Sequence, residues 1–195
     1  MVVHVNKKGI RVLGIAESFR RELEKSVLAG IVMRSDFIID GVGFNRITVG
    51  GMDATEGIVH LVESLHRDDI NLIMLNGCVI SWFNIVDIQE VHERLRIPLI
   101  CVTYEESEGL EDHIAQHFEA HERDVRIKAY KGLGERVPVK LYDHYEVLIR
   151  YLGIEKTEAE VVLKKFTAHG RVPEPLRVAR IVARALLRAD NQFLG

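Results

Sequence analysis

Short apolar runs alternate with polar turns and helical stripes along most of this chain. The clearest run, Leu72–Leu75, breaks at Asn76-Gly77 and gives way to a helical pattern after Asn84. Runs of this length are typical of a strand buried on both faces, as at the centre of an α/β sheet. In open sheets of this class, sites form just beyond the carboxyl ends of the central strands. Chemistry is therefore sought first at Asn76 and Gly77.

Before this run, the pattern predicts an antiparallel meander of three strands followed by a helix. Gly41 and Gly43 are expected to lie in a connection between strands. Asp53, with Glu56 three residues later, resembles a capping box and predicts the start of the helix. The β-like segments are Arg11–Glu17, Val27–Met33, Phe37–Asp40 and Phe44–Val49.

After the run, helical patterns alternate with short strands. Asn84 and Asp87 repeat the capping arrangement ahead of a helical apolar face. The expected order is a helix after Asn84, a strand at Leu99–Val102, a helix around Ile114, and a hairpin or irregular excursion at Val125–Leu141.

The remainder of the chain is expected to be helical. The prolines of Val172–Pro175 predict a rigid link, because proline fixes φ and restricts the residue before it. Expected helices cover Tyr145–Leu152, a segment from a capping box at Thr157 and Glu160 to Gly170, and about Leu176–Leu187. Three strands followed by helix–strand alternation is the ribonuclease H-like order, although other mixed-sheet α/β folds share it.

Composition adds few constraints. The 195 residues suit one domain with a full core, and 47% hydrophobic with 28% charged residues is ordinary for a soluble globular protein. The net charge of −3 means that contact with nucleic acid would need a local basic patch. Cys78 and Cys101 lie in apolar runs and are expected to be buried thiols in a reducing cytosol. Since no membrane-length apolar run or signal-peptide pattern occurs, we expect a cytoplasmic protein.

Four stretches carry a family resemblance: Arg11–Phe19, Gly50–Thr55, Leu75–Asp87 and Ala168–Ala183. They resemble the archaeal domain of unknown function 99 family, also called uncharacterised protein family 0215, and the GRVPEPLRVAR segment is highly specific. That family is similar to endonuclease V. The resemblance implies an α/β fold with a ribonuclease H-like mixed sheet and a helical C-terminal extension. We expect one domain over 1–195, with its α/β core in 1–142 and the extension in 143–195.

Endonuclease V-like enzymes hold divalent metal on carboxylates from the first strand, from the helix after the third strand, and from the end of the fourth strand. Mg²⁺ requires such oxygen ligands, and two metals stabilise the attacking and leaving oxygens of phosphodiester hydrolysis. On this chain the resemblance places Ala16 at the first position and Asn76 at the last, and only Asp53 and Glu56 remain as acids. Glu17 could substitute for the first acid only through a bulge, because side chains alternate along a strand.

Structural explanations compete with these roles. Asp53 and Glu56 are better explained as the two halves of a capping box, because the first and fourth strands no longer supply the partners that metal binding needs. His113, His117 and His121 fall on one helical stripe, where two histidines at i and i+4 can share a metal. Since no catalytic glutamate accompanies them, a solvated helix face is the better interpretation.

Arginines form the most distinctive surface pattern. Arg177, Arg180, Arg184 and Arg188 fall within about 80° of one another around the last predicted helix, and Arg171 precedes it. Such a row could bind phosphates. The alternative is a solvated face whose arginines pair with the excess of acids.

Three functions remain open. We expect an uncharacterised endonuclease V-like protein that associates with DNA or RNA and has a degenerate metal-dependent nuclease site. One alternative is an endonuclease on damaged or deaminated nucleic acid, dependent on Mg²⁺ or Mn²⁺. It would use Glu17, Asp53, Glu56 and Asn76, with metal on Asp53 and Glu56. The other alternative is a protein–protein interaction module without catalysis.

Overall fold

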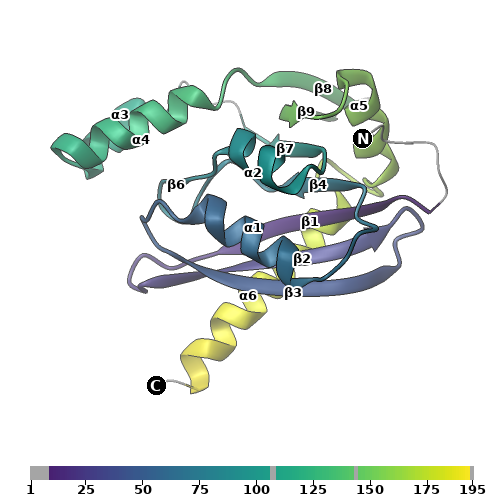
Figure 1. Ribbon diagram of the computed structural model, residues 1–195, viewed down its shortest axis with the longest axis horizontal. Helices are drawn as coiled ribbons and strands as arrows, with labels where there is room; N and C mark the ends of the chain where they lie inside the picture. Colours follow the sequence, from purple (N-terminus) through teal and green to yellow (C-terminus); the bar gives the residue numbers. More distant parts are fainter. Residues whose placement is uncertain (1–8, 106–108, 143–144, 194–195) are drawn as a thin grey trace.

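The computed structural model describes residues 9–105, 109–142 and 145–193, and within them the chain forms a seven-stranded mixed sheet with the order β3-β2-β1-β4-β7-β9-β8 (Figure 1). The strands of this sheet are β1 (Arg11–Ser18), β2 (Lys25–Arg34), β3 (Ile39–Thr48), β4 (Leu72–Leu75), β7 (Leu99–Thr103), β8 (Val137–Tyr142) and β9 (Tyr145–Leu152). A separate ribbon pairs β5 (Val79–Ile80) with β6 (Asn84–Ile85). The helices are α1 (Ala54–Ser64), α2 (Ile88–Leu95), α3 (Glu111–His117), α4 (Ala120–Gly132), α5 (Lys156–Lys165) and α6 (Glu174–Phe193).

The central position of β4 confirms the prediction made from its apolar run. β4 lies between β1 and β7 and runs parallel to both, and all four of its residues are buried. The remaining pairs of the sheet are antiparallel. The carboxyl ends of β1, β4 and β7 therefore point to the same edge.

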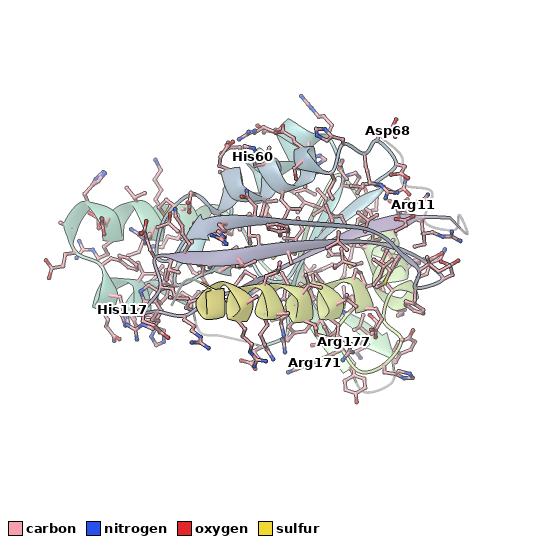
Figure 2. All side chains as sticks on the ribbon, turned by 90° about the horizontal axis from the view of Figure 1, so that it is seen from below. Arg11, His60, Asp68, His117, Arg171 and Arg177 are labelled. Carbon is pink, nitrogen blue, oxygen red and sulfur yellow. A yellow bond between two sulfur atoms is a disulfide. The ribbon has the colours of Figure 1, made fainter. Side chains whose placement is uncertain are left out.

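Helices cover both faces of the sheet (Figure 1). Side chains alternate along a strand, so Leu13 and Ile15 of β1 join one core with α1 and α2, whereas Val12 and Ala16 join a second core with α5 and α6. We call these the α1 face and the α6 face. In Figure 2, His60 of α1 lies on the opposite side of the sheet from α6.

α6 lies directly against β1 because Gly14 has no side chain. A Cβ on Gly14 would stand 2.5 Å from the backbone carbonyl carbon of Pro175. α6 begins at Glu174, two residues earlier than predicted, so Pro175 is part of the helix and not of a link. Proline is tolerated in a first helical turn, where its missing N–H has no partner to lose.

The prediction that Tyr145–Leu152 is helical was wrong. This segment is β9, which pairs antiparallel with β7 and β8 and adds to the sheet. Its residues Val147 and Ile149 are buried two positions apart, which is a strand period. Val125–Leu141 is also more regular than predicted, since α4 runs to Gly132 and β8 starts at Val137.

Two further element predictions need correction. Gly41 and Gly43 do not lie in a connection, because β3 is continuous through both. A Cβ on Gly43 would approach Leu65 Cδ2 to 2.9 Å, so the glycine lets β3 pack under the end of α1. α5 ends before Phe166 and not at Gly170, and its capping box is formed by Glu155 and Glu158.

Cys78 and Cys101 are buried as predicted, but they are not separate thiols. The structure joins them in a disulfide between the segment after β4 and strand β7. Across the described ranges, none of the helices has the length and apolar character that crossing a membrane requires.

Candidate nucleic-acid interface

Ala16 of β1 and Asn76, which directly follows β4, are neighbours at the carboxyl edge of the sheet. The backbone N–H of Asn76 donates to the carbonyl of Ile15 at 3.0 Å, and Ile15 pairs with Leu75. Ala16 is 3% exposed and packs in the same core as Met74. Asn76 follows the last residue of β4 and borders the same small hollow as Ala16, Glu17 and Leu28. The edge thus presents a methyl group and an amide.

Glu17 follows Ala16 along β1, so its side chain leaves the strand on the α1 face, beside its cross-strand partner Leu28. β1 pairs with β2 without a register shift through Ser18, so no bulge turns Glu17 towards Ala16. Its carboxyl borders a hollow of about 10 Å³ with Leu28 and Asn76, which is room for about one water molecule. Burial raises the pKa of Glu17 to about 6, although a hydrogen bond from the Ser81 backbone partly offsets this. Within the described ranges, Glu17 Oε2 has no hydrogen-bond partner.

Asp53 is held by hydrogen bonds and does not cap α1 with its side chain. Its carboxylate accepts from the Thr48 backbone N–H and hydroxyl and from the Asn84 amide. Burial would raise the pKa of Asp53, but the bonds from Asn84 and Thr48 outweigh it and hold the pKa below its usual value. The capping box predicted for Asp53 and Glu56 is therefore absent, and Asn84 Oδ1 accepts the N–H of Ala54, the first residue of α1.

Glu56 faces solvent between α1 and α2. It forms a bidentate ion pair with Arg94 of α2, and this hydrogen bonding lowers the pKa of the Glu56 carboxyl. Its side chain borders a hollow of about 1070 Å³, which Asp87 and Lys128 also line. Asp87, and not Asn84 as predicted, caps α2 by accepting the N–H of Glu90. Glu56 is thus directed away from the edge that holds Asn76.

These side chains do not fit a divalent metal. No group of three or more histidine, cysteine, aspartate or glutamate side chains in the described residues is placed to share an ion. At the carboxyl edge, Ala16 offers no ligand atom and Asn76 offers a neutral amide oxygen, and Glu17 is the one carboxylate among the side chains that line the small hollow there. Mg²⁺ prefers anionic oxygen ligands arranged around one point. We therefore derive no step through a metal.

The three histidines predicted on one helical stripe are divided between two helices. α3 ends at His117, Phe118 is extended (φ −130°, ψ 142°), and His121 belongs to α4. His117 Nδ1 lies 2.8 Å from the carbonyl oxygen of His113. The stripe interpretation fails because the helical period is interrupted at Phe118.

Arginines of α6 line the carboxyl edge on the α6 face. Arg177, Arg180, Arg184 and Arg188 are all exposed, and we call them the arginine row. Arg177 is fixed at the start of α6, where it donates to the carbonyls of His169 and Val172 and pairs with Glu174. In the part of the chain that the structure describes, no carboxylate pairs with Arg180 or Arg184.

Tyr104 shows on which side of α6 the arginine row lies. It follows β7 directly, and burial raises the pKa of its phenol, while the charges of Arg180, Arg177 and Arg171 act in the opposite sense. Arg171 Nη1 also donates to the Tyr104 carbonyl at 2.8 Å. The row therefore faces the carboxyl end of β7. Tyr104 was missed from the sequence, although its position just after a predicted buried strand would have indicated it.

The sequence is similar to those of known proteins over most of its length. A family model described as endonuclease dU matches residues 8–187. A UPF0215 protein of Pyrobaculum calidifontis is 38% identical over 88% of this chain and 93% of its own length. A UPF0215 protein of Thermococcus kodakarensis is 33% identical over 95% of this chain and 96% of its own length.

Solved structures show the same fold. A protein of unknown function from Archaeoglobus fulgidus superposes with a TM-score of 0.78 at 29% identity, covering 91% of this chain and 98% of that one. Endonuclease V of Streptomyces avermitilis superposes with a TM-score of 0.66 at 14% identity, covering 94% and 84%. The predicted ribonuclease H-like, endonuclease V-like fold is confirmed.

Proposed function

The chain belongs to the endonuclease dU family, and we propose that it binds DNA along the arginine row without cutting it by metal-dependent hydrolysis. The family description directs the proposal to DNA that carries deoxyuridine. A solved relative in fold, endonuclease V of Ciona intestinalis, is in complex with a DNA that contains inosine. Inosine and deoxyuridine are both products of base deamination, so we propose deaminated DNA as the ligand class.

The observation that carries the binding proposal is the placement of the arginine row beside the carboxyl edge. Arg180 and Arg184 project from one side of α6 without a carboxylate partner among the described residues. Arg171 and Arg177 extend the positive charge to the start of the helix, next to Tyr104. Guanidinium groups bind phosphates through paired hydrogen bonds, and a local row of them can act in a chain whose net charge is −3.

The proposal of binding without metal-dependent cleavage rests on the neutral edge. Ala16 and Asn76 supply no negative charge, and the raised pKa of the neighbouring Glu17 reduces the negative charge that a phosphate meets at the carboxyl ends of β1 and β4. Asp53 is bonded to Asn84, and Glu56 is bonded to Arg94. Each carboxylate would have to give up its own bond before it could hold an ion. An edge of this kind favours retention of a strand over its hydrolysis.

Fluorescence anisotropy with labelled oligonucleotides tests the proposal. Matched strands carrying deoxyuridine, inosine or thymidine at one position are titrated in EDTA and in Mg²⁺, each at several salt concentrations. We expect affinity to fall as salt rises, and the double variant Arg180→Ala/Arg184→Ala to reduce the slope of log affinity against log salt by about 0.7–0.9 per lost phosphate contact.

The matched control is Arg94→Ala, which removes one arginine from the opposite face and should leave the slope unchanged. Equal affinity of the double variant and the unmodified chain would overturn the proposed interface. Gel analysis of the same samples checks cleavage. Strand cutting that requires Mg²⁺ or Mn²⁺ would overturn the second half of the proposal and support the metal-dependent endonuclease alternative.

A further inference from the structure

Aromatic side chains gather at the end of the sheet beyond β4. Trp82 and Phe83 occupy the turn between β5 and β6, and His117 and Phe118 stand at the end of α3. The ring centroids of Trp82 and His117 are 4.7 Å apart, and those of Phe83 and Phe118 are 5.9 Å apart. We call these four residues the aromatic corner.

The turn that presents Trp82 is in an unfavourable backbone conformation. Ser81, Trp82 and Phe83 have φ values of 45°, 62° and 62°, so three successive non-glycine residues are left-handed. Such conformations cost free energy and persist only where the surroundings impose them. The Ser81 hydroxyl donates to Ser26 at 2.6 Å, and the Ser81 carbonyl accepts from the Gly50 N–H. Nevertheless, Trp82 and Phe83 are only half-buried. The strained turn therefore holds the rings of Trp82 and Phe83 in a partly exposed position.

Two arginines stack on these rings. The guanidinium carbon of Arg21 lies 3.6 Å from the Trp82 ring centroid, and that of Arg126 lies 3.8 Å from the Phe118 centroid. Arg126 is 5% exposed and donates to the carbonyl of Gly50, whereas Arg21 is exposed between β1 and β2. Arg126 is thus a fixed part of the corner. Arg21 can leave the Trp82 face without breaking a buried bond.

His117 of the aromatic corner lies on the same side of the sheet as the start of α6. Figure 2 shows His117, Arg171 and Arg177 on the side of α6, opposite His60. Trp82 follows the carboxyl end of β4 within the same connection that begins at Asn76. A strand bound along α6 could therefore reach the aromatic corner across the carboxyl edge.

We propose that the aromatic corner is a stacking site for one unpaired nucleobase of the bound strand, with Trp82 as its platform. Every nucleobase has a π-face that stacks on an aromatic ring, and neighbouring arginines add cation–π attraction and phosphate contacts. The planar cation of Arg21 occupies the position that the base takes on binding, and its released guanidinium then contacts a phosphate. This inference rests on the proposed function and adds unpaired strands as the preferred form of its ligand.

Trp82 makes the test direct because it is the single tryptophan of the chain. An unlabelled thymidine oligonucleotide with one deoxyuridine is titrated into the full chain while tryptophan emission is recorded. Emission should be quenched with the same midpoint as anisotropy of the labelled strand, and an abasic strand of equal length should quench much less. Duplex DNA without unpaired bases should bind without the quenching.

Variants give a second readout. Trp82→Leu should weaken single-strand binding by about tenfold or more, since it removes one stacked base, whereas Trp82→Phe should stay within about threefold. Phe44→Leu, which removes an exposed aromatic ring from β3, is the control and should change nothing. Far-UV circular dichroism checks that each variant is folded.

The outcomes separate the two proposals. Binding by anisotropy without quenching in the unmodified chain would overturn the stacking site and leave the interface on α6 intact. Binding by Trp82→Leu as tight as that of the unmodified chain would do the same. Absence of binding by any strand at low salt would overturn both proposals.

Discussion

The side-chain amide of Asn84 donates a 2.7 Å hydrogen bond to the carboxylate of Asp53. The same amide donates to the Thr48 carbonyl, and its oxygen accepts the first free N–H of α1, from Ala54. Asn84 itself is fully buried. One asparagine thus joins β6, the end of β3 and the start of α1, and it commits Asp53 to a structural bond.

Replacing Asn84 should therefore be costly. Asn84→Ala leaves the N–H of Ala54 and part of the Asp53 carboxylate without partners, and we expect a loss of about 2–4 kcal/mol in the free energy of unfolding. Asn84→Asp keeps the shape but places a carboxylate against Asp53, so the loss should be larger at pH 7 than at pH 4. Urea unfolding at both pH values measures this.

Asp87→Ala is the control, because Asp87 also caps a helix but is exposed. Its loss should be about 1 kcal/mol. If Asn84→Ala cost no more than Asp87→Ala, Asn84 would not hold the start of α1 as described.

The sequence predicted those parts of the fold that depend on local periodicity. β4 was recognised from four apolar residues in succession, and the arginine row from its helical spacing, because both signals are contained within one element. Tyr145–Leu152 was mistaken for a helix because the alternation of Val147 and Ile149 is short, and only pairing with β7 decides it.

The site was harder to predict because its bonds join distant segments. Asn84 was assigned to the helix that follows it, whereas its partners Thr48 and Asp53 lie more than 30 residues earlier. Nothing in the local sequence marks such a partner. The stacking of Arg21 on Trp82 is invisible for the same reason.

A second prediction concerns Glu17. Burial raises the folded-state pKa of this carboxyl to about 6 from an ordinary value of 4.5, so the folded state favours its protonated form. The contribution of Glu17 to the free energy of unfolding is therefore fully present below about pH 4.5 and is lost as pH rises through about 6, by roughly 2 kcal/mol at most. Glu17→Gln removes this dependence and should be more stable than the unmodified chain at pH 8, but not at pH 4.5.

Urea unfolding from pH 4.5 to 8 provides the measurement. Glu56→Gln serves as the control and should gain no stability at pH 8, because Arg94 lowers the pKa of Glu56 rather than raising it. A Glu17→Gln variant whose unfolding free energy kept a constant offset from the unmodified chain at every pH would contradict the raised pKa.

A third prediction concerns the docking of α6. Gly14→Ala would place its Cβ 2.5 Å from backbone atoms of Pro175, which cannot rotate away, so β1 and α6 must separate. We expect a loss of about 2–3 kcal/mol in the free energy of unfolding, together with weaker DNA binding as the arginine row shifts. Thermal and urea unfolding, followed by the anisotropy assay, measure both effects.

Gly132→Ala is the matched control, because no atom lies within 4 Å of the position of its Cβ at the end of α4. This variant should be neutral or more stable by up to about 1 kcal/mol. Equal effects of the two substitutions would show that general loss of glycine, and not contact with Pro175, determines the outcome.

The last prediction restores charge at the carboxyl edge. Ala16 lies in β1 and Asn76 directly follows the adjacent parallel strand β4, and the N–H of Asn76 bonds to the residue before Ala16. Neighbouring strands are about 4.8 Å apart, so carboxylates at both positions could share one ion. The double variant Ala16→Asp/Asn76→Asp should be less stable in EDTA, because like charges repel in a buried setting, and should regain stability when Mg²⁺ or Mn²⁺ is added.

Thermal unfolding with and without the ions measures this, and calorimetric titration with Mn²⁺ gives the binding directly. The unmodified chain should show no specific shift, and the single variant Asn76→Asp should show a smaller one than the double variant. If the unmodified chain bound Mn²⁺ as tightly as the double variant, the ion would be held by other residues, and the neutral edge would no longer argue for binding without cleavage. If the double variant alone bound the ion, the two missing carboxylates would be sufficient to account for the difference from a metal-binding edge.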